Sequence, residues 1–314
     1  MSSNSSNELV SVVIVNYNRR DDLREAIQSI DRQDYPSFEV IVVDNASRDD
    51  SVEMLSHEFP KVKVIKSAEN LGMDGYSVGF REARGTYVFQ MDNDSEMPDP
   101  TVLSEVVRRF REGSPKLAVV ATRVEEAGFP RIDVQVLRAR DQRRGPLNLR
   151  HFHSGGVGFR KSALDQVGYY NRDVFLYGSE MFLEIKFLAA GFEVLMYPEI
   201  LMLHKGSPTA RSPLFLYYTV RNGLWYMRCH GTALQKLRYI PISLLYNLGQ
   251  GLWKRQLSPF LRAARDGLGA LPPSLQNPIK SNNPDYVARV HRVGQWTNAA
   301  SLIRNVVSRL RGTL

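Results

Sequence analysis

Residues 9–16 read LVSVVIVN, a continuous run of mostly β-branched, apolar side chains. A strand that is buried on both faces of a parallel sheet has this composition. Asp21 can cap a helix after this strand, and Pro36 ends the connection. A second apolar run, FEVIVVD, follows at residues 38–44. The pattern predicts a strand, a helix and a second strand of one sheet.

Shorter apolar runs at residues 62–65 and 87–91 continue the alternation of strands with helices. This alternation predicts an α/β fold with a mostly parallel central sheet flanked by helices, in which ligands bind at the carboxyl ends of the strands. Polar clusters stand at three of these ends, namely NYN at 16–18, DNAS at 44–47 and DND at 92–94. We therefore look for a site there.

The rest of the chain has a different pattern. Residues 1–8 (MSSNSSNE) are polar and are expected to be a disordered tail rather than a signal peptide. Beyond Pro115 we expect a strand at 117–124, a basic loop at 138–150 and a helix near 180–190. After Pro208 the pattern becomes mainly helical.

The 314 residues include 41 Lys and Arg against 33 Asp and Glu, a formal charge of +8. This charge can attract phosphates, nucleic acid or an anionic membrane surface, and it does not choose among them. The single cysteine, Cys229, excludes an intrachain disulfide and is best interpreted as a buried structural thiol in a reducing compartment. Polar residues interrupt every apolar segment, so we expect no membrane-spanning helix.

Asp92 and Asp94 place two carboxylates just after an apolar strand. Side chains two residues apart in an extended segment point the same way. Hard oxygen ligands of this kind suit Mg²⁺ or Mn²⁺, with substrate phosphates completing the coordination. A solvated acidic turn is the alternative interpretation.

Four motifs occur in order: VSVVIVNYN from Val10, VIVVDNASRDDS from Val40, ENLG from Glu69 and TYVFQMDND from Thr86. With HSGGVGFRKSALDQVGYY from His153, they resemble the family 2 glycosyltransferases, inverting enzymes with a GT-A fold. The resemblance covers roughly residues 10–207, and the bacterial rhamnosyltransferase-like branch is the most similar.

The chain is expected to contain four regions, and the resemblance implies the middle two of them. They are the tail 1–8, a nucleotide-sugar-binding half at 9–115, an acceptor-binding half of the same catalytic domain at 116–208, and a helical C-terminal region at 209–314.

The resemblance also implies roles for single residues. Asp44 would bind the base and ribose, Asp92 the ribose, and Asp94 the Mn²⁺ or Mg²⁺ ion. His204 matches a histidine that can add a metal ligand, and Ser207 would lie near the diphosphate. The other residues expected at the donor come from the matched motifs: Asn16, Asn18, Asn70 and Gly72.

Glu180 occupies the position where the family usually carries an Asp as general base, and the pair here reads Ser179-Glu180. A helix N-terminal glutamate favoured by the macrodipole is the alternative. Gly155 and Gly156 can let the backbone approach an acceptor sugar, or they can form a strand bulge. The family also has a longer run of small residues where this chain reads MDGYSVGFREAR, so donor contacts from that run cannot be carried over.

The predicted activity is metal-dependent, inverting transfer of one sugar from a nucleotide diphosphate sugar, dTDP-rhamnose or a UDP-sugar, to a hydroxyl of a saccharide or lipid-linked saccharide. The pathway expected is bacterial cell-surface polysaccharide synthesis. The QxxRW motif of processive members is absent, which favours one transfer per binding event.

No G-x-G-x-x-G follows the first strand, which disfavours a nicotinamide dehydrogenase. The alternative is an inactive nucleotide-binding or membrane-surface binding protein with the same fold. We expect a cytoplasmic protein with no nucleic-acid partner.

The C-terminal region contains two amphipathic patterns. The apolar residues of the first are Leu257, Phe260, Leu261, Ala264 and Leu268. Those of the second are Leu302, Ile303, Val306, Val307 and Leu310. Such helices either lie on the inner face of an anionic membrane or pack on the catalytic domain or form a homo-oligomer.

Overall fold

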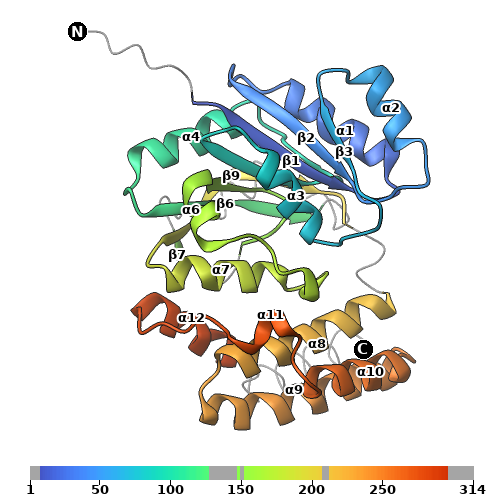
Figure 1. Ribbon diagram of the computed structural model, residues 1–314, viewed down its shortest axis with the longest axis vertical. Helices are drawn as coiled ribbons and strands as arrows, with labels where there is room; N and C mark the ends of the chain where they lie inside the picture. The colour runs from blue at the N-terminus through green and yellow to red at the C-terminus, as the bar shows by residue number, and fades with distance from the viewer. Residues whose placement is uncertain (1–7, 127–146, 149–151, 207–211, 296–314) are drawn as a thin grey trace, which may run out of the picture. The chain divides into compact units, whose positions relative to one another are not determined.

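The structure, a computed structural model, describes residues 8–126, 147–148, 152–206 and 212–295. The chain divides into two compact units (Figure 1). The first comprises Met1–Phe175 and Ala190–Ser207, and it holds the sheet. The second comprises Leu176–Ala189 and Pro208–Leu314, and its described elements are helices.

The parallel half of the sheet contains β1 (Val10–Asn16), β2 (Phe38–Asp44), β3 (Lys63–Lys66) and β4 (Tyr87–Asp92), in the order β3-β2-β1-β4. The prediction of parallel strands at the start of the chain is confirmed. Asn16 pairs with Asp44 in the register of β1 and β2, and Val15 pairs with Asp92 in the register of β1 and β4. The carboxyl ends of these strands therefore meet at one edge.

The remaining strands are β5 (Ser95–Glu96), β6 (Leu117–Glu126), β7 (Leu147–Asn148), β8 (Val157–Arg160) and β9 (Glu193–His204). β8 runs antiparallel to β4 and to β6, and β9 runs parallel to β6. β5 is antiparallel to β9, and Ser95 pairs with His204. This last pairing brings the end of β9 to the turn that follows β4.

Helices cover both faces of the parallel strands. The bounds in the first unit are α1 (Arg20–Asp31), α2 (Ser51–Glu58), α3 (Asp74–Glu82), α4 (Val102–Glu112), α6 (Lys161–Val167) and the 3-10 helix η1 (Arg172–Val174). Val12 and Ile14 share a core with α1, α2 and α4, whereas Val13 faces α3. This alternation follows from the period of two in a strand.

The expected cap of α1 was wrong. The helix begins at Arg20, so Asp21 lies inside its first turn and does not cap it. The Arg20 backbone N–H instead donates to the Asp49 carboxylate at 3.0 Å. A side chain from the segment before α2 thus supplies the acceptor that the helix start needs.

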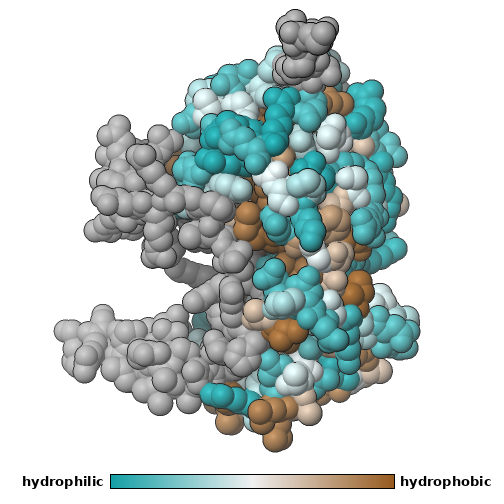
Figure 2. Space-filling view, turned by 90° about the vertical axis from the view of Figure 1, so that its left-hand side faces the viewer, coloured by the Kyte–Doolittle hydropathy of each residue, from teal (hydrophilic) through white to brown (hydrophobic). Residues whose placement is uncertain are grey.

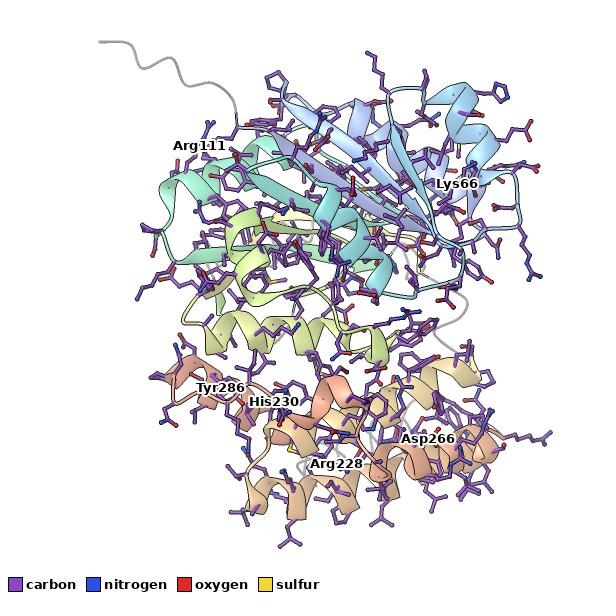
Figure 3. All side chains as sticks on the ribbon, in the orientation of Figure 1. Lys66, Arg111, Arg228, His230, Asp266 and Tyr286 are labelled. Atoms are coloured by element: carbon purple, nitrogen blue, oxygen red, sulfur yellow. The ribbon has the colours of Figure 1, made fainter. Side chains whose placement is uncertain are left out.

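The second unit contains α7 (Ser179–Ala189), α8 (Pro213–His230), α9 (Ala233–Trp253), α10 (Leu257–Leu268), α11 (Pro273–Gln276) and α12 (Pro284–Gln295). Leu216, Val220 and Leu224 of α8 pack on Phe260 and Ala263 of α10. Figure 3 shows His230, at the end of α8, beside Tyr286 of α12, and their side chains are hydrogen-bonded at 3.1 Å.

The apolar face expected at residues 257–268 is only partly buried. Phe260 is buried in the core of this unit, whereas Leu257, Leu261 and Leu268 are exposed. The pattern expected at 302–310 lies outside the described residues. Within the described part of the chain, no helix is both long and apolar enough to cross a membrane.

Candidate metal and nucleotide-sugar site

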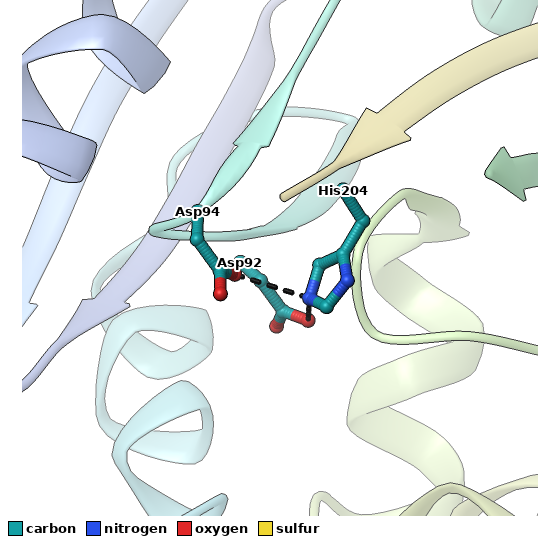
Figure 4. Close-up of side chains that lie close together, drawn as sticks. All are labelled: Asp92, Asp94 and His204. Carbon is teal, nitrogen blue, oxygen red and sulfur yellow. Dashed lines mark ion pairs between the residues drawn. The ribbon is translucent and has the colours of Figure 1, made fainter. Parts of the chain in front are cut away.

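Two carboxylates and one imidazole meet at the edge of the sheet (Figure 4). Asp92 ends β4, Asp94 lies in the turn after it, and His204 ends β9. His204 Nε2 lies 3.1 Å from an Asp94 oxygen and 3.8 Å from an Asp92 oxygen. One ligand atom from each of the three residues lies within 4.8 Å of the others. The structure thus brings together the three residues that the sequence analysis associates with the metal and ribose.

Asp92 is held by hydroxyl groups on both of its oxygens. The Tyr76 hydroxyl donates to Oδ1 at 2.8 Å, and the Ser154 hydroxyl donates to Oδ2 at 2.7 Å. Burial and the nearby Asp92 charge raise the pKa of Tyr76 well above its ordinary value of 10, so this hydroxyl keeps its proton. Sequence reasoning missed both residues, although Tyr76 lies in the run that departs from the family and Ser154 precedes Gly155.

Asp94 is 5% exposed and has cationic or protonatable groups on both oxygens. His204 lies beside Oδ1, and Arg19 Nη1 lies 3.1 Å from Oδ2. Burial alone would raise the pKa of Asp94, but the hydrogen bond from His204 and the charges of His204 and Arg19 outweigh it and lower that pKa. Asp94 is therefore a carboxylate at neutral pH. Arg19, directly after the first polar cluster, was not among the predicted residues.

The predicted donor residues at the ends of β1 and β2 form a hydrogen-bonded cluster. Asn16 Nδ2 donates to Asp44 Oδ1 at 3.3 Å and to Ser47 Oγ at 3.2 Å, while the Ser47 N–H donates to Asp44 Oδ2 at 3.0 Å. Asn18 has a φ of 53° and accepts a hydrogen bond from the Arg48 N–H at 2.6 Å. The buried Asp44 is thus fixed by partners on both oxygens.

Asn93 links this cluster to the acidic residues. Its Nδ2 donates to Asn16 Oδ1 at 2.9 Å, and it stands between Asp92 and Asp94 in the chain. The ends of β1, β2 and β4 therefore form one continuous polar edge. An ion held at one end of it would lie within the same network as the residues expected at the base and ribose.

Asn70 and Gly72 lie beside this edge in a loop. Asn45 Nδ2 donates to Asn70 Oδ1 at 3.4 Å and to the Gly72 carbonyl at 3.0 Å. Gly72 has a φ of 58°, and a Cβ there would lie 2.3 Å from the Phe175 carbonyl oxygen. Both residues shape the loop, and their contact with the donor stays a prediction. Ser207 lies outside the described residues.

Gly155 and Gly156 precede β8, and protein atoms fill the space beside them. A Cβ on Gly156 would lie 2.4 Å from Met202 Cγ and 2.7 Å from Thr122 Oγ1. Packing between neighbouring strands is thus sufficient to require glycine at 156. The acceptor role of these two glycines stays a prediction.

Glu180 lies in the first turn of α7, in the second unit, and is partly buried. Phe182 and Ile185 are buried on the same helix and anchor it. The backbone before the helix is constrained, since Tyr177 has a φ of 53° and the Leu176 and Tyr177 carbonyls both accept from Asn222 Nδ2, at 2.7 and 2.8 Å. Strained backbone of this kind is common at functional sites.

A family model described as Glycosyl transferase family 2 matches residues 11–168. The match includes the acidic turn and the donor cluster. The chain therefore belongs to glycosyl transferase family 2.

Relatives and solved structures agree with this membership. A dolichol-phosphate mannosyltransferase of Pyrococcus furiosus is 34% identical over 110 residues, which cover 33% of this chain and 31% of that protein. The first three curated relatives are matched over only 28% to 31% of their length.

Two solved structures share the fold. The mannosyltransferase PcManGT from Pyrobaculum calidifontis, in complex with GDP-Man and Mn²⁺, has a TM-score of 0.57 and 20% identity, covering 95% of this chain and 87% of that one. S. aureus TarS 1-349, in complex with UDP-GlcNAc, has a TM-score of 0.59 and 16% identity, covering 85% and 82%. The GT-A prediction for the fold is therefore confirmed, whereas nothing in these matches singles out the rhamnosyltransferase-like branch.

Proposed function

We propose that this protein transfers one sugar from a nucleotide diphosphate sugar to an acceptor hydroxyl with the help of a divalent cation. The observation that carries the proposal is the cluster of Asp92, Asp94 and His204, joined through Asn93 to the Asn16 and Asp44 pair. Family membership supplies the reaction class. The cluster supplies a place for the cation beside the residues expected at the nucleotide.

The residues present fit Mn²⁺ or Mg²⁺. Ligands about 2.1 Å from one ion lie at most about 4.2 Å apart, so atoms within 4.8 Å need only a small closure. An imidazole among the ligands favours Mn²⁺ over Mg²⁺. When bound, the cation would neutralise charge on the diphosphate leaving group and orient it. The Mn²⁺ in the complex of PcManGT with GDP-Man supports the same choice.

The chain's own residues position the donor. Tyr76 and Ser154 fix both oxygens of Asp92, so this carboxylate can accept from a ribose hydroxyl and offer an oxygen to the cation beside Asp94 and His204 without reorienting. Asp44, fixed by Asn16 and Ser47, would hold the base and ribose. Asn18, Asn70 and Gly72 would complete the donor site, and Ser207 would approach the diphosphate.

We assign the general base to Glu180, with Gly155 and Gly156 near the acceptor. Glu180 would take the proton of the acceptor hydroxyl while the hydroxyl oxygen attacks the anomeric carbon and the nucleoside diphosphate leaves. One displacement of this kind inverts the anomeric centre. The acceptor is a saccharide or a lipid-linked saccharide.

We propose a UDP-sugar or dTDP-rhamnose as the donor, and the UDP-GlcNAc in the complex of TarS 1-349 supports a UDP-sugar. The GDP-Man in the PcManGT complex adds GDP-mannose as a third donor to be tested. We also propose a cytoplasmic location and a role in cell-surface polysaccharide synthesis. The free, buried thiol of Cys229 supports a reducing compartment.

Calorimetry and donor turnover test the proposal together. We expect UDP, GDP or dTDP to bind at least about tenfold more tightly with Mn²⁺ than with EDTA, since the cation would bridge the protein and the diphosphate. Slow, Mn²⁺-dependent hydrolysis of the matching nucleotide sugar should accompany binding. Nucleotide binding without any turnover would favour the alternative of an inactive binding protein, and equal affinity with and without Mn²⁺ would reject the metal site.

A further inference from the structure

The helix α9 exposes an apolar stripe along its length. Five large side chains on it are between 59% and 75% exposed, and we call them the α9 stripe: Leu234, Leu237, Leu245, Leu252 and Trp253. Their positions repeat at helical spacing, so Leu234 and Leu252 lie on one side of the helix, about 27 Å apart at 1.5 Å per residue. In Figure 2, hydrophobic residues reach the surface at the lower edge of the view, the edge at which Figure 1 places α9.

The stripe is not the inner face of the helix. Ile240, Leu244 and Leu248 already pack on the core formed by α8 and α10, and Ser243 and Gly251 are buried. An ordinary surface helix has polar residues opposite its buried face. α9 has leucines on both sides, and an exposed apolar row of this length marks an interaction surface.

The charges beside the stripe are all positive. No Asp or Glu occurs from residue 208 to residue 265. Arg238 is exposed on α9, and Lys254 and Arg255 are exposed directly after Trp253. Beyond Lys254 and Arg255, Leu257 and Leu261 of α10 are also exposed apolar residues.

The same imbalance extends to the C-terminus. Residues 208–314 contain 15 Lys and Arg but only two carboxylates, Asp266 and Asp285, whereas the whole chain has a net charge of only +8. The positive charge is thus concentrated in the helical region. A second copy of this region would bring like charge to the stripe, and residues 296–314 contain arginines and no Asp or Glu, so neither complements the positive charge beside the stripe.

We propose that the α9 stripe and its flanking cations form a docking surface for an anionic lipid bilayer. Leucines and a terminal tryptophan would enter the interface while Arg238, Lys254 and Arg255 contact lipid phosphates. The proposal does not depend on the transferase activity, since it rests on exposed residues of α9 and α10 alone.

Vesicle flotation of the full-length protein tests this surface. We expect binding to vesicles of phosphatidylcholine with phosphatidylglycerol, weakened by salt, and at least about tenfold weaker binding to phosphatidylcholine alone. Leu237→Ser combined with Leu245→Ser should weaken binding at least about tenfold. Arg238→Gln and Lys254→Gln should each weaken it about fivefold.

A matched control uses apolar residues of the same unit outside the stripe. Ile279 and Val287 are 48% and 52% exposed, and Ile279→Ser combined with Val287→Ser should leave vesicle binding unchanged. All of these side chains are exposed, so thermal unfolding without lipid should be the same for each variant. Equal losses in the stripe variant and in this control would overturn the proposal.

A fluorescent label distinguishes the bilayer from the other occupants. Cys229 is the only cysteine, so Leu245→Cys in a Cys229→Ser background accepts a single environment-sensitive probe. We expect a water-like emission in solution and a blue shift with anionic vesicles. A blue-shifted probe in solution that vesicles do not change would show that a second copy or residues 296–314 cover the stripe, which overturns the proposal.

Discussion

The hydroxyl of Tyr76 is predicted to set the affinity of the metal site. It donates to Asp92 Oδ1 at 2.8 Å and also lies 2.9 Å from the Met91 carbonyl, so one hydrogen serves two acceptors. Tyr76→Phe removes this hydrogen and keeps the ring, which packs on Phe80 at 5.9 Å between centroids. The substitution therefore isolates the hydrogen bond to the carboxylate.

The magnitude follows from the kind of bond that is lost. A hydrogen bond to a charged group contributes about 1.5–3 kcal/mol. Loss of a partner of a metal ligand costs about 10- to 100-fold in metal affinity, which is the same range, since 1.4 kcal/mol is a factor of ten. Because Tyr76 shares its hydrogen with Met91, we expect the lower end, about tenfold.

Calorimetric titration of Mn²⁺ into the protein with nucleoside diphosphate measures this effect. Tyr170→Phe is the matched control, because the Tyr170 hydroxyl is also buried and donates to Gln90 Oε1 at 2.9 Å rather than to a carboxylate. We expect unchanged Mn²⁺ affinity in Tyr170→Phe. The reasoning is refuted if Tyr76→Phe binds Mn²⁺ as tightly as the parent, or if both variants lose affinity equally.

Three further predictions concern the site and the second unit. Asp94→Ala should abolish the Mn²⁺ dependence of nucleotide binding in calorimetry, while Asp22→Ala, which removes another carboxylate paired with Arg19, should keep it. Glu180→Gln should retain donor and Mn²⁺ binding but lose most of the transfer rate in single-turnover assays, with partial activity in Glu180→Asp; comparable rates in the parent and the Gln variant would move the base elsewhere. Burial lowers the pKa of the His230 imidazole from 6.5 to about 4. As the pH falls, His230 therefore becomes protonated in the unfolded chain before it does so in the folded protein. The free energy of unfolding should fall by about 3 kcal/mol between pH 6.5 and pH 4. Urea titrations should show this loss in the parent and not in His230→Gln, and an equal loss in both would contradict the assignment.

The polar edge formed by the ends of β1, β2 and β4 was predictable from the sequence, because parallel strands align their carboxyl ends. Asn16, Asp44 and Asp92 each end an apolar run, and the register of β1 with β2 and β4 brings them together. Local sequence is sufficient for this prediction, since each strand is visible as a continuous apolar run. His204 was found only through the resemblance, because its approach to Asp94 depends on the pairing of Ser95 with His204.

The residues that support the carboxylates could not be found from local sequence. Arg19 pairs with Asp94, and Ser154 donates to Asp92, but neither stands in a pattern that distinguishes it from an ordinary surface or loop residue. The same holds for the start of α1, where the acceptor is Asp49 rather than the nearby Asp21. Partners that come from distant segments are decided by the fold and leave no periodic signal.

The run MDGYSVGFREAR departs from the family pattern, and its bulky residues position Tyr76 beside Asp92. It forms α3, and a Cβ on Gly79 would lie 2.4 Å from Val13 Cγ1, so this helix needs glycine there to approach β1 closely. Phe80 on the same helix packs on Tyr170 at 6.2 Å between centroids, which fixes the helix from the other side. Tyr76, one turn before Phe80, is thereby placed with its hydroxyl on Asp92. The bulky residues of this run thus hold Tyr76 rigidly against Asp92. The Tyr76→Phe measurement tests directly whether Tyr76 supports this carboxylate.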